Sequence, residues 1–201
     1  MMAAPIEFFF DFASPYGYVA SHLIEAVGGR HGRAVIWKPY MMGAVFKIAG
    51  TGPLMDYPLK GAYAACDMAR TCRLHGLPLT FADGFPHSTL APARAFYWLA
   101  DRDEGLAKRF ALAAYDAYFG AGHNTGDPAV TGEIAAGLGL DAGEVLAAIQ
   151  DPAIKVRLKA ETDSAIERGI FGSPFFIVDG EPFWGADRLD QLERWLASGG
   201  W

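Results

Sequence analysis

The stretch from Ile6 to Tyr18, IEFFFDFASPYGY, constrains the fold more than any other part of the sequence. It begins with aromatic and branched residues, which favour a buried strand. Ser14 then stands where a helix N-cap is expected. Pro15 follows at the first helical position, where its missing N–H costs nothing. The stretch therefore predicts a strand over 6–12 that ends at the N-terminus of a helix, with the Ser14 hydroxyl at the junction.

The predicted position of Ser14 also suits an anion. The first N–H groups of a helix have no partner within the helix, and the helix dipole is positive at that end. The simplest role for Ser14 is that of a cap. A role in chemistry is the alternative, and this stretch alone leaves both open.

The order of the remaining elements predicts an α/β protein. A second strand is expected over 34–40, and the helix between it and the first strand implies a parallel pair. Strand character returns only at 173–178 and 181–184, which are joined by the hairpin turn Asp179-Gly180. These terminal pieces complete a four-stranded mixed sheet of the thioredoxin type if the middle of the chain is an insertion.

The middle of the chain is predicted to be helical after an irregular segment at 50–61, where glycine and proline gather. A last helix is expected to start at Asp187. Helices are predicted over 62–76, 93–101 with a continuation to 119 that breaks near Asp103, 131–138, 142–150 and 152–168.

Composition narrows the class of protein. The 201 residues suffice for one large domain or for a small domain that carries an insertion. A net charge of -6 without a basic stripe argues against nucleic acid as a partner. No apolar run approaches the roughly 20 residues of a membrane span, and the first residues lack the basic segment of a secretory signal. We expect a soluble, cytoplasmic protein that does not bind a membrane.

The two cysteines, Cys66 and Cys72, lie six positions apart, on opposite sides of a predicted helix. They do not form a CxxC redox pair, and no residues with the spacing of metal ligands surround them. We therefore predict free, partly buried structural thiols and no metal site.

The two ends of the chain resemble a known family. The start FDFxSPYxY and the end FGSPFFIVDGEPFWGADRL are similar to those of 2-hydroxychromene-2-carboxylate isomerases. These enzymes form the glutathione-dependent branch of the DsbA-like thioredoxin superfamily, which also contains the kappa-class glutathione transferases. The resemblance spans nearly the whole chain, although the middle matches only loosely. It implies a discontinuous thioredoxin-like domain, 1–45 and 165–201, with an all-helical insertion over 46–164.

The resemblance also implies roles for residues at both ends. Ser14 would replace the first cysteine of the redox CxxC, and Gly17 stands where the second would be, which excludes disulfide exchange by that route. Glutathione would supply the sulfur, and Ser14 would act in catalysis by donating a hydrogen bond to its thiolate. Gly172, Ser173 and Pro174 would bind the glutathione backbone, with Pro174 in the cis form.

For the charged γ-glutamyl end of glutathione, the resemblance implies Trp184, Asp187 and Arg188. Asp187 would meet the ammonium group and Arg188 a carboxylate, each through a charge-assisted hydrogen bond. Without the resemblance, the default role of Asp187 is to cap the last helix.

For the substrate, the family pattern indicates Lys47, Tyr16 and Arg94. Lys47 would lie near an acidic carboxylate, and Tyr16 would form an aromatic wall. The structural alternatives are a solvated surface lysine at Lys47 and, at Arg94, a brace between helices through carboxylates. Two asparagines that the family has in this part of the chain have no counterpart here. His87 lies in the region of one of them, and we expect it to be an ordinary loop histidine.

The implied function is glutathione-dependent isomerisation without net redox change. The enzyme would interconvert 2-hydroxychromene-2-carboxylate and trans-o-hydroxybenzylidenepyruvate, or a related aromatic keto acid, by reversible addition of the thiolate to an alkene. The alternatives are a kappa-class transferase or peroxidase, which would release the conjugate, and a non-catalytic thioredoxin-like binding domain. The family further implies a homodimer.

Overall fold

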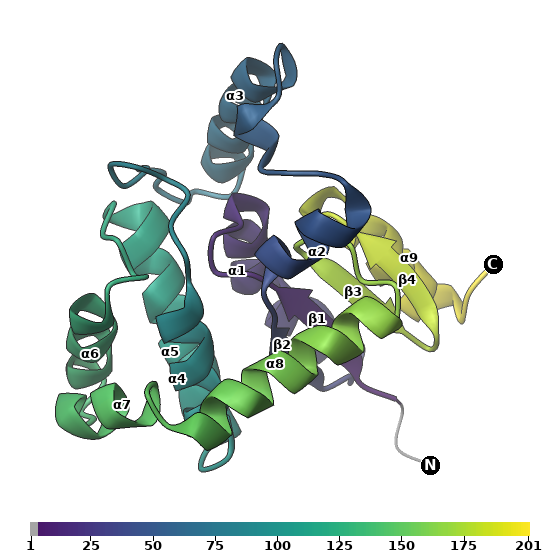
Figure 1. Ribbon diagram of the computed structural model, residues 1–201. Helices are drawn as coiled ribbons and strands as arrows, with labels where there is room; N and C mark the ends of the chain where they lie inside the picture. Colours follow the sequence, from purple (N-terminus) through teal and green to yellow (C-terminus); the bar gives the residue numbers. More distant parts are fainter. Residues whose placement is uncertain (1–3) are drawn as a thin grey trace.

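A computed structural model of the protein describes residues 4–201 and centres on a four-stranded sheet (Figure 1). The strands are β1 (Ile6–Phe10), β2 (Val35–Pro39), β3 (Phe175–Val178) and β4 (Glu181–Trp184). Their order in the sheet is β2-β1-β3-β4. β1 pairs parallel to β2 and antiparallel to β3, and β3 pairs antiparallel to β4. The predicted mixed thioredoxin-like sheet is confirmed.

The central strand β1 divides the apolar core in two because successive side chains point to opposite faces of a sheet. Phe8 and Phe10 belong to the larger cluster, where Phe8 stacks on Phe176 with ring centroids 5.3 Å apart. Phe9 points the other way and packs in a second cluster with Phe175 and Tyr40. Helices must therefore cover both faces of the sheet.

Nine α-helices are described in residues 4–201 (Figure 1). α1 (Pro15–Arg30) follows β1, and α9 (Leu189–Ser198) packs against it. The middle of the chain contains α2 (Met42–Ala49), a 3-10 turn η1 (Leu54–Asp56), α3 (Lys60–Leu74), α4 (Leu90–Ala100), α5 (Glu104–Tyr115) with a π-helical turn η2 (Asp116–Gly120), α6 (Pro128–Gly137), α7 (Ala142–Ala148) and α8 (Pro152–Glu167). In Figure 1, α3 projects beyond the sheet and α4 to α7 gather on the side away from α9. The boundaries predicted for the insertion stay a prediction.

Helix α2 is the one α-helix of residues 4–201 that the sequence did not indicate. Its N-cap residue, Met41, makes no side-chain capping bond. The missing cap comes from another element, because the Asp11 carboxylate accepts a hydrogen bond from the Met42 N–H at 2.7 Å. A helix that is capped by a residue 31 positions earlier, just after β1, carries no local start signal.

Three further predictions differ from the structure. The last helix does not start at Asp187, which lies in a 3-10 turn, η3 (Ala186–Arg188), before α9. The segment 50–61 contains the turn η1 rather than only a loop. Both cysteines are free, as predicted, but Cys66 is exposed whereas Cys72 is buried.

Two features are missing from the part of the chain that the structure describes. No helix in residues 4–201 is long and apolar enough to cross a membrane. Nor do these residues contain a cluster of three or more His, Cys, Asp or Glu side chains able to hold a metal ion.

Candidate active site

Ser14 lies at the junction of β1 and α1, where it caps the helix. Its Oγ accepts a hydrogen bond from the Gly17 N–H at 3.0 Å, which confirms the predicted cap. The same hydroxyl donates to the carbonyl oxygen of Ser173 at 2.8 Å, across 159 positions of the sequence. The two ends of the chain therefore meet at this hydroxyl.

The loop before β3 is held against this junction. The Ser173-Pro174 peptide is cis, as the family resemblance implied. The Ser173 Oγ accepts from the Asp11 N–H at 2.9 Å, and the Gly172 carbonyl accepts from the Tyr40 hydroxyl at 2.7 Å. Gly172, Ser173 and Pro174 thus form one fixed wall beside Ser14.

The buried carboxylate of Asp11 lies behind this wall. It accepts hydrogen bonds from the Ala13 N–H at 2.8 Å, the Met42 N–H at 2.7 Å and the Thr89 hydroxyl at 2.8 Å. Burial raises its pKa, and these hydrogen bonds oppose the shift. Asp11 was not among the predicted site residues, although an acid within the otherwise apolar run 6–12 was a usable signal. Through these hydrogen bonds, Asp11 joins the segment between β1 and Ser14 to the starts of α2 and α4.

The segment predicted for the γ-glutamyl end lies beside the same junction. The Trp184 indole covers Gly172 so closely that a Cβ there would overlap it. The turn η3, with Asp187 and Arg188, contacts α1, and the charge of Asp187 contributes to a raised pKa of Tyr16. Asp187 is not a cap, because the structure gives α9 no side-chain capping bond. Instead its carboxylate pairs with the neighbouring Arg188 guanidinium at 2.9 Å.

Within residues 4–201, no hydrogen bond or ion pair joins the three residues predicted for the substrate to one another. Tyr16 donates its hydroxyl to the Asp67 carboxylate of α3 at 2.7 Å, and burial, followed by this bond, raises its pKa. Lys47 is exposed in the last turn of α2 and has no ion pair within residues 4–201. Arg94 donates to the Ile149 carbonyl at 3.3 Å, so it braces two helices through a backbone group rather than the predicted carboxylate.

His87 lies in a loop, as predicted, and it has a defined partner there. Its backbone N–H donates to the Tyr118 hydroxyl at 2.9 Å, and its ring Nδ1 lies 3.1 Å from the same oxygen. Tyr118 belongs to the π-helical turn that ends α5. The pair anchors the loop that leads to Thr89 and α4.

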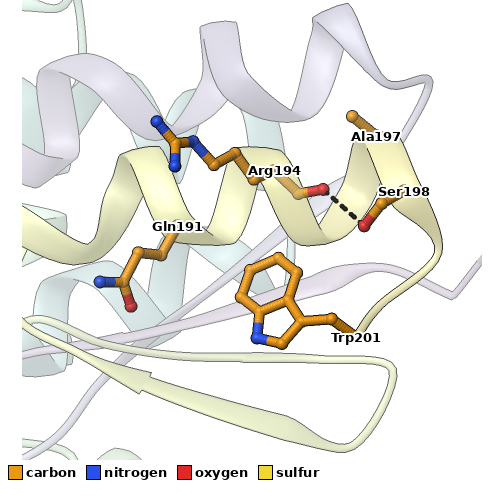
Figure 2. A pocket seen from close by; sticks show the side chains of 5 residues that line it. All are labelled: Gln191, Arg194, Ala197, Ser198 and Trp201. Carbon is orange, nitrogen blue, oxygen red and sulfur yellow. Dashed lines mark hydrogen bonds between the residues drawn. The ribbon is translucent and has the colours of Figure 1, made fainter.

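Two open cavities border α9, and Ser14 lines neither of them. One, of about 570 Å³, is bordered by the side chains in Figure 2, where the Trp201 indole lies beneath the helix and Ser198 donates to the Arg194 carbonyl. A second cavity, of about 330 Å³, shares Trp201 and extends along β4 to Trp184 and Arg188. A shallow groove thus adjoins the segment predicted for the γ-glutamyl end, and the cavity of Figure 2 contains none of the predicted site residues.

The comparisons with known proteins agree with this arrangement. The model of the DSBA-like thioredoxin domain matches residues 5–197. The chain is 31% identical over 197 residues to a 2-hydroxychromene-2-carboxylate isomerase of Sphingobium xenophagum, with 97% of this chain and 99% of the relative covered. The chain belongs to the DsbA-like thioredoxin family. This confirms the family predicted from the terminal motifs.

Other relatives of this DsbA-like chain support the same branch. A solved 2-hydroxychromene-2-carboxylate isomerase superposes with a TM-score of 0.84 at 27% identity, covering 96% of this chain and 94% of that one. A kappa 2 glutathione S-transferase of Caenorhabditis elegans is 26% identical and covers 96% of this chain and 91% of its own length. The prediction of an isomerase is confirmed at the level of reaction class.

Proposed function

We propose that this protein is a glutathione-dependent isomerase that interconverts 2-hydroxychromene-2-carboxylate and trans-o-hydroxybenzylidenepyruvate, or a closely related aromatic keto acid. The observation that carries the proposal is the junction of Ser14 with the cis Ser173-Pro174 peptide. It places a hydroxyl at a helix N-terminus where positions 14 and 17 carry serine and glycine rather than cysteine. The isomerase names of the relatives support the reaction, and the kappa-class relative supports glutathione.

The residues at the junction fit a ligand with a thiolate. When bound, glutathione would supply a nucleophile that adds to the alkene and leaves again after rotation or ring opening. Ser14 has one proton to donate, so its hydroxyl would turn from the Ser173 carbonyl to the sulfur. The positive end of α1 lowers the pKa of a nearby thiol, which in the free state is about 8.5. Ser14 would thereby favour the reactive ionised form.

The backbone of the cis-proline loop also fits. The Ser173 N–H has no protein acceptor within residues 4–201, so it offers a donor to a ligand that lies beside the loop like an added strand. Gly172 brings the Trp184 indole against the same loop. We propose that these groups hold the central part of glutathione.

Asp187 and Arg188 fit the charged γ-glutamyl end. Their side chains are 73% and 45% exposed, and an exposed pair of this kind is worth about 0–1 kcal/mol. A zwitterionic ligand can therefore open the pair at little cost. Its ammonium group would bind Asp187 and its carboxylate Arg188.

We propose Lys47 as the partner of the substrate carboxylate, because it is an exposed lysine without an ion pair within residues 4–201. Tyr16 stands one helical step beyond Pro15 and would flank the aromatic ring of the substrate. The guanidinium of Arg94 is partly desolvated, which lowers its pKa, and its Nε has no partner among the described residues. It would contribute positive charge for an acidic substrate.

We also propose that the protein is a homodimer and is located in the cytoplasm. Size-exclusion chromatography with light scattering would check the homodimer, and cell fractionation would check the location.

Replacement of Ser14 tests the function. The Ser14→Ala variant should lose about 100-fold or more in kcat while its fold stays intact by circular dichroism, because one transition-state hydrogen bond to an anion is worth that much. An unchanged kcat would contradict the role of Ser14. Omitting glutathione from the wild-type assay should abolish isomerisation, and activity without any thiol would contradict the cofactor.

The kappa-class relative supports one other candidate function, namely glutathione transfer. The two reactions differ in the fate of glutathione, which an isomerase returns and a transferase consumes. Quantifying free glutathione before and after complete substrate turnover separates them. Loss of one glutathione per substrate would establish transfer. If neither reaction occurs and calorimetry detects no binding at millimolar glutathione, the protein is a binding domain of another kind.

A further inference from the structure

The space beside Gly17 in α1 is filled by a side chain from α5. A Cβ placed on Gly17 would lie 2.5 Å from the Tyr115 hydroxyl oxygen, 3.1 Å from the Ser173 Oγ and 3.2 Å from the Ser14 Cβ. Real Cβ atoms essentially never approach another heavy atom to less than 3.0 Å. Position 17 therefore accepts a side chain only if the Tyr115 hydroxyl moves.

Tyr115 is held so firmly that it has little freedom to move. Its side chain is fully buried, and its hydroxyl donates to the Asp11 carbonyl at 2.9 Å. Its ring packs against Phe10 and Phe12 with centroids 5.7 and 5.2 Å away. Overpacking in such a core forces side chains off their rotamers or shifts the backbone.

The backbone itself would not prevent a second sulfur at position 17. In disulfides the two Cβ atoms are about 3.5–4.5 Å apart. The Ser14 Cβ lies 3.2 Å from the ideal Cβ at position 17, so a shift of a few tenths of an ångström reaches this range. What blocks the second sulfur is the phenol of a residue that is 98 positions further along the chain.

We propose that Tyr115 is a specificity-determining positioning residue, whose hydroxyl keeps position 17 without a side chain and so prevents the site from forming its own disulfide. Together with Ser14, which stands where the first sulfur of a pair would be, this restricts the site to a sulfur that a ligand brings in. This inference concerns the space at position 17 and does not depend on which thiol binds. Its failure would leave the proposed isomerase untouched.

A set of alanine variants tests the steric part. We expect Gly17→Ala to lower Tm by roughly 3–10 °C in the wild-type background, as an overpacked core position should. In the Tyr115→Phe background, which lacks the obstructing oxygen, the same change should lower Tm by less than half as much. Comparing the two differences removes the cost of the lost Tyr115–Asp11 hydrogen bond.

Gly29 provides the matched control in the same helix, since a Cβ there meets no atom within 4 Å. Gly29→Ala should leave Tm unchanged or raise it, because alanine favours a helix over glycine. If Gly17→Ala behaves like Gly29→Ala, or if its effect is the same with and without the Tyr115 hydroxyl, the proposal is wrong.

Disulfide formation tests the chemical part. All variants carry Cys66→Ala, because Cys66 is exposed. Oxidised glutathione can convert the two thiols of a Ser14→Cys/Gly17→Cys variant into one disulfide, with release of two molecules of reduced glutathione. We expect this bridge to form at least 10-fold faster when Tyr115→Phe is added, as measured by the loss of two hydrogens in the intact mass.

A merely structural role of Tyr115 would not produce this gain, because it predicts a less stable protein and no easier bridge. Equal rates in both backgrounds, or no bridge in either, would overturn the proposal. If the double-cysteine variant that keeps Tyr115 fails to fold, the proposal is supported when adding Tyr115→Phe restores folding and the bridge forms. Failure of both variants to fold counts against the proposal.

Discussion

The junction around Ser14 and the segment from α2 to α3 differ in how their residues are held. At the junction, hydrogen bonds to Ser14, Ser173 and Asp11 connect parts of the chain that are up to 162 positions apart. In the α2–α3 segment, large apolar side chains face solvent, and Leu59 is 93% exposed with a positive φ of 67°. The part proposed to hold the sulfur is joined by long-range hydrogen bonds, whereas Lys47, which is proposed for the substrate carboxylate, lies in the segment with exposed apolar side chains.

This difference suits two separate tasks, which are charge stabilisation at the junction and substrate selection in the α2–α3 segment. Stabilising a charge that develops on a fixed sulfur requires donors that are already oriented. Selecting among aromatic acids requires a surface that tolerates change, and exposed segments with few buried contacts tolerate it best. Variants in each region test whether the two are held as differently as these contacts indicate.

The largest expected effect is that of Asp11→Ala. The change leaves buried donors on Met42 and Thr89 without their shared acceptor, and each such group costs about 1–3 kcal/mol. We expect the free energy of unfolding to fall by about 3–5 kcal/mol, measured in urea. As a control, Asp67→Ala in α3 should cost at most about 1 kcal/mol. Equal losses would show that the junction is no more firmly held than the α3 segment.

The pH dependence of stability sharpens this prediction. Burial raises the pKa of Asp11 in the folded state above the unfolded value of about 3.9. The folded protein therefore binds more protons between these two values, and the contribution of Asp11 to stability grows as the pH falls through that window. We expect wild type to gain stability relative to Asp11→Asn in this window. A constant difference would contradict the raised pKa.

A kinetic effect without a stability effect is expected at Lys47. Lys47→Met should lower kcat/KM for the acidic substrate about 10-fold, equivalent to 1.4 kcal/mol, mostly through KM. Tm should not change, because the side chain is exposed and unpaired within residues 4–201. Lys60→Met, at the start of α3, is the control and should leave both quantities near wild type. A large change in Tm at Lys47 would assign it to structure.

The smallest expected effect is that of Tyr16→Phe. It removes the hydroxyl that donates to Asp67 and so links α1 to α3. We expect the free energy of unfolding to fall by about 1 kcal/mol. The rate of limited proteolysis within α3 should rise by more than the loss of global stability accounts for. Tyr63→Phe serves as the control, because the Tyr63 hydroxyl meets Arg70 and Asp67, which both lie in α3 itself. Unchanged proteolysis would mean that other contacts hold α3.

Much of the fold could be predicted because its signals are local. Three of these signals are the apolar run of β1, the Ser14-Pro15 start of α1 and the Asp179-Gly180 turn, each of which acts within a few residues. The predicted cap at Asp187 failed because a 3-10 turn precedes α9. The bonds of Arg94 to Ile149 and of Tyr16 to Asp67 could not be predicted, because they join residues 51 or more positions apart.

The sequence alone was enough to predict the strands of the sheet, the capped start of α1 and the two terminal motifs that meet at Ser14. Only the tertiary structure decided that Asp11 caps α2 and that Tyr115 fills the space beside Gly17. The physical reason is the same in both cases. A cap or a filled space depends on which atom lies within about 3 Å, and folding brings these atoms from elements that no local pattern connects.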